Sequence, residues 1–153
     1  MAIRNIIQIG DETLRKKSFE VTSFDEKLAT LLDDMRDTLT KARGAGLAAP
    51  QVGILRRVFI VDVEEGYFEF VNPVIVSRSG KQIGQEGCLS VKGKWGTVER
   101  PNKVVIKAQD RHGNKFQLTA KEFFARAVCH EYDHLDGILY VDIATEIENE
   151  AND

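Results

Sequence analysis

The chain has 153 residues, of which 42% are hydrophobic, and its formal net charge at pH 7 is −3. This length predicts one domain over residues 1–153 that buries roughly 70% of the surface of its unfolded state. The weakly acidic charge argues against a general DNA- or RNA-binding protein. The chain has two cysteines and no apolar run long enough for a signal peptide or a membrane span. We therefore expect a cytoplasmic protein with no DNA or membrane partner.

An amphipathic helix is the first element that the sequence predicts. Residues 23–26 read Ser-Phe-Asp-Glu, a capping box that would begin this helix. The apolar side chains that follow have the spacing of one buried helix face: Leu28, Leu31, Leu32, Met35 and Leu39.

Residues 44–51, with the sequence GAGLAAPQ, admit two interpretations. A dinucleotide-binding fingerprint, G-x-G-x-x-A, would use Asp62 or Glu64 to bind a ribose, but it has to follow a strand and begin a helix. Here a helix precedes the glycines, and Pro50 follows too closely for a helix to begin cleanly. We therefore reject the nucleotide interpretation and expect an extended loop.

Two glycine-containing segments could approach a ligand closely. In the extended loop, Gly44 and Gly46 would let the main chain approach, and the amide of Gln51 could donate a hydrogen bond. In the later segment Glu-Gly-Cys-Leu-Ser, Gly87 has the same effect, and the thiolate of Cys88 could bind a metal ion.

The central part of the chain predicts strands separated by turns. The apolar patterns favour strands at Arg57–Val63, Tyr67–Val71, Pro73–Ser77, Val98–Ala108 and Lys115–Leu118. His112 lies in the sequence Asp-Arg-His-Gly-Asn, which is typical of an exposed hairpin turn, so we do not expect it to bind a metal. Strands that are segregated from helices predict an α+β fold.

The sequence His-Glu-Tyr-Asp-His, near the end of the chain, is its most informative motif. It falls in a helix that a second capping box, at residues 119–122, would begin and Gly137 would end. Residues four apart lie on the same face of a helix. His130 and His134 could therefore bind one metal ion, with Glu131 beside it, as a metal-assisted hydrolase requires.

A catalytic site of this kind uses three protein ligands and leaves one position open. Downstream, the metzincin spacing would require a histidine where Tyr140 stands, and the remaining glutamates lie in the last few residues. Upstream, Cys88 is the better third ligand. Cys129 precedes His130 directly and points about 100° around the helix from it, so we expect Cys129 to pack in the core.

Asp133 faces away from the metal side of its helix. Our hypothesis is that Asp133 pairs with Arg100 and fixes the helix to the sheet; the alternative is that both are solvated charges.

The last part of the chain is acidic. The chain after Val141 contains no lysine or arginine, and we expect residues 144–153 to form an acidic, flexible tail. Such a tail is unsuited to binding ribosomal RNA.

Together these residues resemble the peptide deformylase family closely. The motifs of that family are G-x-G-x-A-A-x-Q, E-G-C-x-S and H-E-x-D-H, and they occur here at residues 44–51, 86–90 and 130–134, in the family's order. The resemblance extends over nearly the whole chain. Lys92 stands where a proline is common and Cys129 where a glutamine is common, which affects loop shape and packing rather than the metal ligands.

The resemblance implies small antiparallel β-sheets packed around a central helix that carries H-E-x-x-H. It implies hydrolysis of N-formyl-methionyl peptides to formate and a free amine. Cys88, His130 and His134 would bind the metal, and a metal-bound water would attack the formyl carbon. Glu131 would act as general base and then as general acid.

The resemblance also supplies the other residues of the site. The amide of Gln51 and the backbone N–H of Leu89 would stabilise the oxyanion. Phe123 and Leu89 would help to line an apolar pocket for the methionine side chain. We expect the substrate-binding residues to include Gly44, Gly46, Gly87 and Ala127.

The cofactor and partners follow from the same resemblance. It implies Fe²⁺ as the physiological ion, and Zn²⁺, Ni²⁺ or Co²⁺ could substitute because Cys/His sites accept them. The partners would be N-formylmethionyl nascent peptides, encountered in transient proximity to the ribosome.

Two other functions remain open on the sequence alone. A zinc endopeptidase would share H-E-x-x-H, although no convincing downstream ligand is present. A non-catalytic metal- or peptide-binding protein could keep the same scaffold, although it would gain nothing from Glu131 beside an open metal position.

Overall fold

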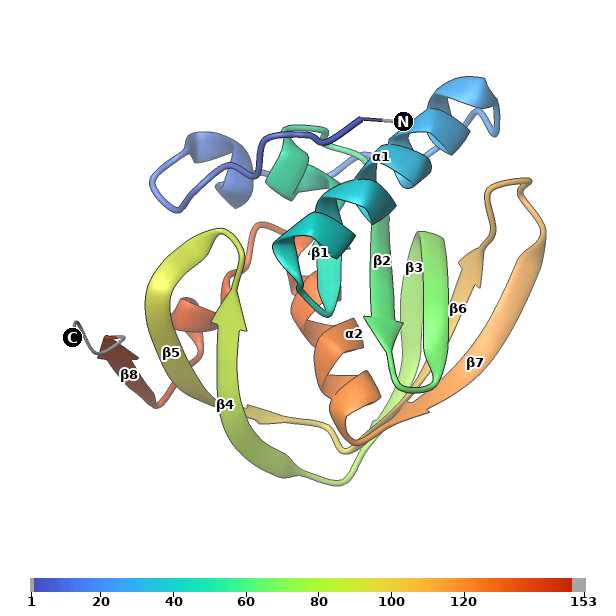
Figure 1. Ribbon diagram of the computed structural model, residues 1–153. Coiled ribbons are helices and arrows are strands. Elements are labelled where there is room, and N and C mark those ends of the chain that lie inside the picture. Colours follow the sequence, from blue (N-terminus) through green and yellow to red (C-terminus); the bar gives the residue numbers. More distant parts are fainter. Residues whose placement is uncertain (1, 150–153) are drawn as a thin grey trace.

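Helix α2 (Phe123–His134) lies between two antiparallel sheets in the computed structural model, which describes residues 2–149 (Figure 1). The larger sheet consists, in spatial order, of β1 (Gly46–Ala48), β2 (Val58–Val63), β3 (Gly66–Ser79), β6 (Lys103–Gln109) and β7 (Lys115–Lys121). The smaller sheet consists, in spatial order, of β4 (Gln82–Cys88), β5 (Val91–Arg100) and β8 (Glu146–Asn149). The predicted α+β fold, with small antiparallel sheets around the H-E-x-x-H helix, is confirmed.

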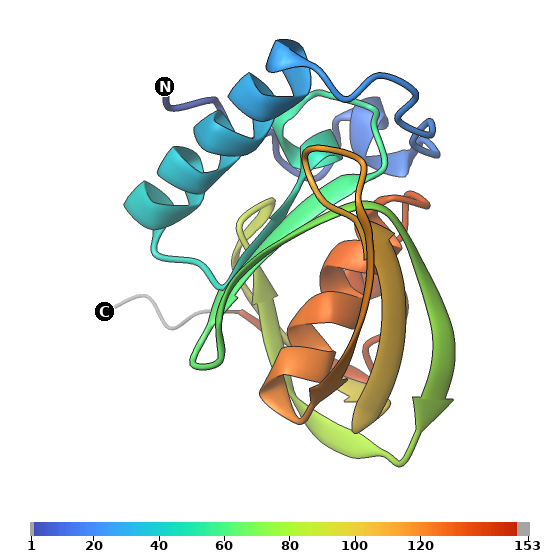
Figure 2. The ribbon, with the colours of Figure 1, turned by 90° about the vertical axis from the view of Figure 1, so that its right-hand side faces the viewer.

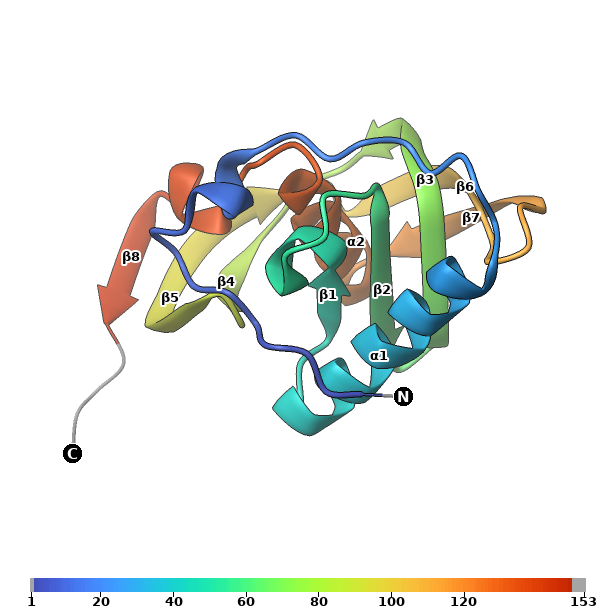
Figure 3. The same ribbon diagram turned by 90° about the horizontal axis from the view of Figure 1, so that it is seen from above.

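Helix α1 (Glu26–Ala42) packs on the face of the larger sheet opposite to α2 (Figure 3). Its buried apolar face contains the predicted residues Leu28, Leu31, Leu32, Met35 and Leu39. The predicted capping box at residues 23–26 is wrong, because Asp25 and not Ser23 is the N-cap of the helix. The helix begins after Asp25, whose carboxylate accepts the backbone N–H groups of Lys27 and Leu28 and so satisfies two free donors of the first turn.

Strand β2 explains why the core has two parts. Successive side chains of a strand point to opposite faces of the sheet. Phe59 and Val61 therefore pack with α2, whereas Val58 and Ile60 pack with α1. All four are fully buried, which accounts for the continuous apolar run in the sequence. Figure 2 shows how the larger sheet curves around α2.

Strand β7 runs directly into α2, so the capping box predicted at residues 119–122 is wrong. Its first three residues are paired with β6 as part of the sheet. Glu122 then turns the chain with a φ of +56° and makes no side-chain cap. The other end of α2 agrees with the prediction: Gly137 adopts a φ of +76°, and the N–H of Ile138 donates to the carbonyl of Asp133.

Two predicted strand boundaries are wrong, and one strand was not predicted. The predicted strand Pro73–Ser77 is the second half of the continuous strand β3, which carries two register irregularities. The predicted run Val98–Ala108 is divided into β5 and β6 at Pro101, which has no N–H for a ladder hydrogen bond. Strand β4 was missed because its sequence, QIGQEGC, contains two glycines and few apolar residues.

Four residues of the predicted acidic tail, Glu146–Asn149, form the exposed strand β8, which pairs with residues 94–97 of β5. Residues 150–153, the rest of that tail, lie outside the described residues. Within residues 2–149, no helix is long and apolar enough to cross a lipid bilayer.

Candidate metal centre

The end of β4 and the C-terminal half of α2 bring three candidate metal ligands together. Cys88 Sγ lies 3.4 Å from His134 Nε2. One ligand atom each from Cys88, His130 and His134 lies within 4.8 Å of the others. These are the three residues that the sequence predicts as ligands, and their atoms are close enough to contact one ion.

The donor set fits a transition metal such as iron, cobalt, nickel or zinc, because it combines one thiol with two imidazoles. Both histidines are buried, with exposed fractions of 8% for His130 and 0% for His134. The Oε1 atom of Glu131 is also buried and has no hydrogen-bond partner among residues 2–149. A buried carboxylate oxygen without a partner is costly, so its position beside three ligand atoms suits a site that holds a cation.

Glu86, on β4, orients the first histidine. Its Oε1 atom lies 2.8 Å from His130 Nδ1, which leaves His130 Nε2 to face the other ligands. Burial opposes ionisation of Glu86, but hydrogen bonds from Arg100 and His130 hold the pKa of this carboxyl well below its usual range. Arg126 Nη1 adds a contact of 2.7 Å to Glu86 Oε2. The carboxylate is thus ionised and held from three sides.

Glu86 and Arg126 are functional-site residues that the sequence reasoning missed. Glu86 stands two positions before Cys88, and a histidine that binds a metal commonly donates its other N–H to a carboxylate. That rule could have marked Glu86, but the strand that carries it was not predicted.

The predicted ion pair between Arg100 and Asp133 is present. Arg100 Nη1 lies 2.7 Å from Asp133 Oδ2, and its Nε and Nη2 atoms donate to the two oxygens of Glu86 at 2.8 and 2.9 Å. Arg100 is 5% exposed. One guanidinium group therefore ties β4 and β5 to α2 beside the metal ligands.

Glu131 projects from α2 towards β1. Burial raises its pKa to about 7, an effect that a bound cation would oppose. A Cβ atom added to Gly46 would lie 2.6 Å from Glu131 Oε2. The glycine at this position of β1 therefore makes room for the carboxylate of Glu131.

Gln51 lies in a short 3-10 helix, Ala49–Val52, that follows β1 directly where the sequence predicts an extended loop. Its Oε1 atom accepts the N–H of Ala48 at 2.9 Å, which fixes the direction of the carboxamide. Its Nε2 atom lies 3.0 Å from Ser90 Oγ and 3.6 Å from Cys88 Sγ. Leu89 follows Cys88 in the turn between β4 and β5, so both predicted oxyanion donors are next to the candidate ligands.

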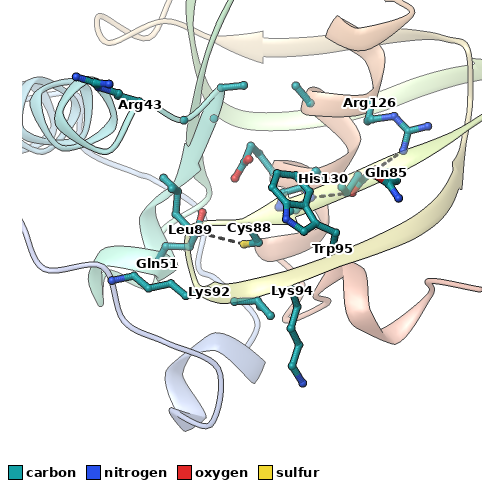
Figure 4. Close-up of a pocket in the computed structure, with 18 of the residues that line it drawn as sticks. Arg43, Gln51, Gln85, Cys88, Leu89, Lys92, Lys94, Trp95, Arg126 and His130 are labelled. Carbon is teal, nitrogen blue, oxygen red and sulfur yellow. Dashed lines mark hydrogen bonds and ion pairs between the residues drawn. The ribbon is translucent and has the colours of Figure 1, made fainter. Parts of the chain in front are cut away.

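A cavity of about 380 Å³ opens beside these residues and exposes mainly apolar surface (Figure 4). Its lining contains the predicted pocket residues Leu89, Phe123 and Ala127. Trp95, on β5, also lines it and was not predicted. The ring of Trp95 lies 2.9 Å from the position that a Cβ atom at Gly87 would take.

The remaining predicted residues are placed as follows. Gly44 and Gly46 both line the cavity, and a Cβ atom at Gly44 would lie 2.9 Å from the side chain of Leu89. Cys129 is buried in the core cluster between α2 and the larger sheet, and His112 is exposed in the turn between β6 and β7. Both agree with the prediction.

Comparison with known proteins identifies the family. The family model for polypeptide deformylase matches residues 3–150. The peptide deformylase of Caldicellulosiruptor bescii is 59% identical over 142 residues, which cover 93% of this chain and 86% of that protein. The peptide deformylase of Clostridium botulinum is 52% identical over 146 residues, which cover 95% of this chain and 99% of that protein.

Two crystal structures show the same fold. A peptide deformylase from Legionella pneumophila superposes with a TM-score of 0.91 at 46% identity, over 94% of this chain and 87% of that chain. The peptide deformylase of Thermotoga maritima superposes with a TM-score of 0.93 at 35% identity, over 95% of this chain and all of that chain. With the three motifs gathered at one cavity, these matches show that the chain belongs to the polypeptide deformylase family.

Proposed function

We propose that the protein is a metal-dependent peptide deformylase that removes the formyl group from the N-terminal formyl-methionine of newly made polypeptides and releases formate. The observation that supports this most directly is the position of the buried carboxylate of Glu131 beside three candidate ligands at an apolar cavity. Membership in the polypeptide deformylase family supports the same reaction.

Cys88, His130 and His134 would hold the metal ion. When bound, the ion would activate a water molecule and polarise the formyl carbonyl. We propose Fe²⁺ as the physiological ion, and expect Zn²⁺, Ni²⁺ and Co²⁺ to substitute for it because the thiolate and imidazole ligands accept all four.

Glu131 would transfer the proton. Its carboxylate takes a proton from the attacking water, whose oxygen forms the new bond to the formyl carbon. When the bond between that carbon and the methionine nitrogen breaks, Glu131 gives the proton to the departing amine. One water is consumed, and formate and a free α-amine are the products.

The developing oxyanion would accept hydrogen bonds from the Nε2 group of Gln51 and the backbone N–H of Leu89. The hydrogen bond between Gln51 Oε1 and Ala48 supports this role, because it fixes the amide before the substrate arrives. The substrate backbone would extend beside the edge strand β1, past Gly46 and then Gly44, and would pass Gly87 on β4. The methionine side chain would enter the cavity near Ala127.

The substrates would be N-formylmethionyl nascent chains in the cytoplasm, which the enzyme meets close to the ribosome. The acidic residues of β8 are unsuited to holding ribosomal RNA, so we expect this encounter to be transient. We expect that the enzyme does not bind DNA. We also expect residues 1–153 to form a single catalytic domain.

Formate release from a formyl-Met-Ala-Ser peptide tests this function, with protein loaded anaerobically with Fe²⁺ or Ni²⁺. We expect equal amounts of formate and of the peptide with a free amino terminus. Cleavage of the Met-Ala bond would instead indicate an endopeptidase. Bound metal with no change to any formylated peptide would indicate a non-catalytic binding protein.

A further inference from the structure

We propose that the mouth of the cavity selects substrates by charge, and that an acidic side chain at the third position of the formylated peptide is preferred. The inference deepens the proposed deformylase function and rests on it. It concerns three side chains at the rim of the cavity, Arg43, Lys92 and Lys94, which we call the cationic rim.

Among the described residues that line the cavity, every exposed charged side chain is cationic. The two acidic residues of the lining, Glu86 and Glu131, are 5% and 4% exposed and lie at its inner end. Glu86 is moreover neutralised by two arginines. The exposed charges that border the cavity are therefore all positive, although the whole chain carries a net charge of −3.

The cationic rim has two sides, and neither is engaged in an ion pair within residues 2–149. Arg43 comes from the C-terminal end of α1, whereas Lys92 and Lys94 come from the start of β5 (Figure 4). A cleft bordered by charges of one sign raises the local concentration of ligands of the opposite sign.

The path of the substrate brings its third residue to Arg43. The formyl group has to lie beside Glu131, and Gly46 is the residue of β1 next to that carboxylate. We place the methionine that carries the formyl group opposite Gly46. A peptide that runs antiparallel to this edge strand then reaches Gly44, two residues before the start of β1, with its third residue. The third residue of the peptide therefore lies opposite Gly44, next to Arg43.

We expect an effect of the size of an exposed ion pair, about two- to fivefold in kcat/KM. The preference for the acidic peptide should appear as a lower KM, because the cationic rim does not touch the reacting atoms. This preference should also decrease between about 0.05 and 0.5 M salt, since the Debye length falls below 10 Å over that range.

The test uses three peptides with amidated C-termini, formyl-Met-Ala-Glu, formyl-Met-Ala-Gln and formyl-Met-Ala-Lys, with the metal-loaded protein. The Glu peptide should have the highest kcat/KM and the Lys peptide the lowest. In Arg43→Glu the order of the Glu and Lys peptides should reverse. Lys107→Glu is the matched control: it makes the same charge change at an exposed site of β6 outside this cavity, and it should keep the wild-type order.

The outcomes separate this proposal from the proposed function. Equal kcat/KM values for the three peptides, with formate released from each, would overturn charge selection and leave the deformylase assignment intact. No formate from the neutral Gln peptide would overturn the deformylase assignment itself. Equal values together with competitive inhibition by a short RNA at low salt would also overturn the proposal, and would show that the rim binds phosphates instead.

Discussion

The carboxylate of Glu86, on β4 of the smaller sheet, lies 2.8 Å from Nδ1 of His130, the first histidine of α2. This contact makes Nδ1 of His130 the nitrogen that bonds to Glu86 and leaves Nε2 for the metal. Because two arginines hold the same carboxylate, the orientation of the ligand depends on packing between the smaller sheet and α2. The candidate metal site therefore depends on the packing that forms the fold.

Glu86→Gln should weaken metal binding by about 10- to 100-fold, since it removes the charge that orients and polarises His130. Metal affinity can be measured by competition with a chelator of known strength. Glu99→Gln, an exposed site on the adjacent strand β5, is the control and should bind metal as the wild type does. Unchanged affinity in Glu86→Gln would show that this carboxylate does not support the ligand.

Arg100→Ala should lower the free energy of unfolding by about 3–5 kcal/mol, because it leaves the carboxylate of Glu86 buried with one fewer partner and frees Asp133. Urea denaturation of the metal-free protein isolates this effect from metal binding. Arg78→Ala changes the same residue type at an exposed site of β3 and should cost less than about 0.5 kcal/mol. Equal losses in the two variants would contradict a structural role for the network around Arg100.

Gly46→Ala should reduce kcat by about 10- to 100-fold with the fold retained. The added methyl group would lie 2.6 Å from Glu131 Oε2, so the carboxylate has to move from its place beside the ligands. Formate release and metal content should be measured on the same sample. Full activity with a full complement of metal would mean that the position of Glu131 is not critical.

Asp34→Asn should destabilise the protein by about 1–2 kcal/mol at pH 7. Burial opposes ionisation of Asp34, but hydrogen bonds from the N–H of Ala2 and from Arg4 hold the pKa of this carboxyl below its usual value. A folded-state pKa below the unfolded one stabilises the protein above the unfolded value, near 3.9, and this stabilisation is lost as the pH falls through the folded pKa.

The difference in stability between wild type and Asp34→Asn should accordingly be complete above about pH 5 and shrink below pH 4. Urea denaturation at several pH values measures it directly. A difference that stays constant down to pH 2 would show that the ionised carboxylate of Asp34 is not the group responsible.

The sequence predicted best the features that depend on local spacing. The four-residue interval between His130 and His134 is enough to place both on one face of a helix, and the apolar interval from Leu28 to Leu39 is enough to define the buried face of α1. The need for a third donor led to Cys88 as a candidate ligand, but its distance to His134 depends on chain segments 46 residues apart, which local spacing does not encode.

The features that the sequence did not predict depend on contacts that local spacing does not encode. Strand β4 has too little apolar character to be recognised, so Glu86 could not be matched with His130. The start of α2 was misplaced because Glu122 reverses the chain with a positive φ, where a capping box is the usual signal. Gly46 was expected to make room for the substrate, but its nearest neighbour is Glu131.

Formate release by Glu131→Gln, measured with the metal content of the same sample, tests the central claim most directly. The variant keeps the size of the side chain and removes its ability to accept a proton. We expect it to retain the metal and to lose about 10²- to 10⁴-fold in kcat on a formyl-Met peptide. A metal-loaded variant with a rate close to that of the wild type would contradict the account, because another group would then have to transfer the proton.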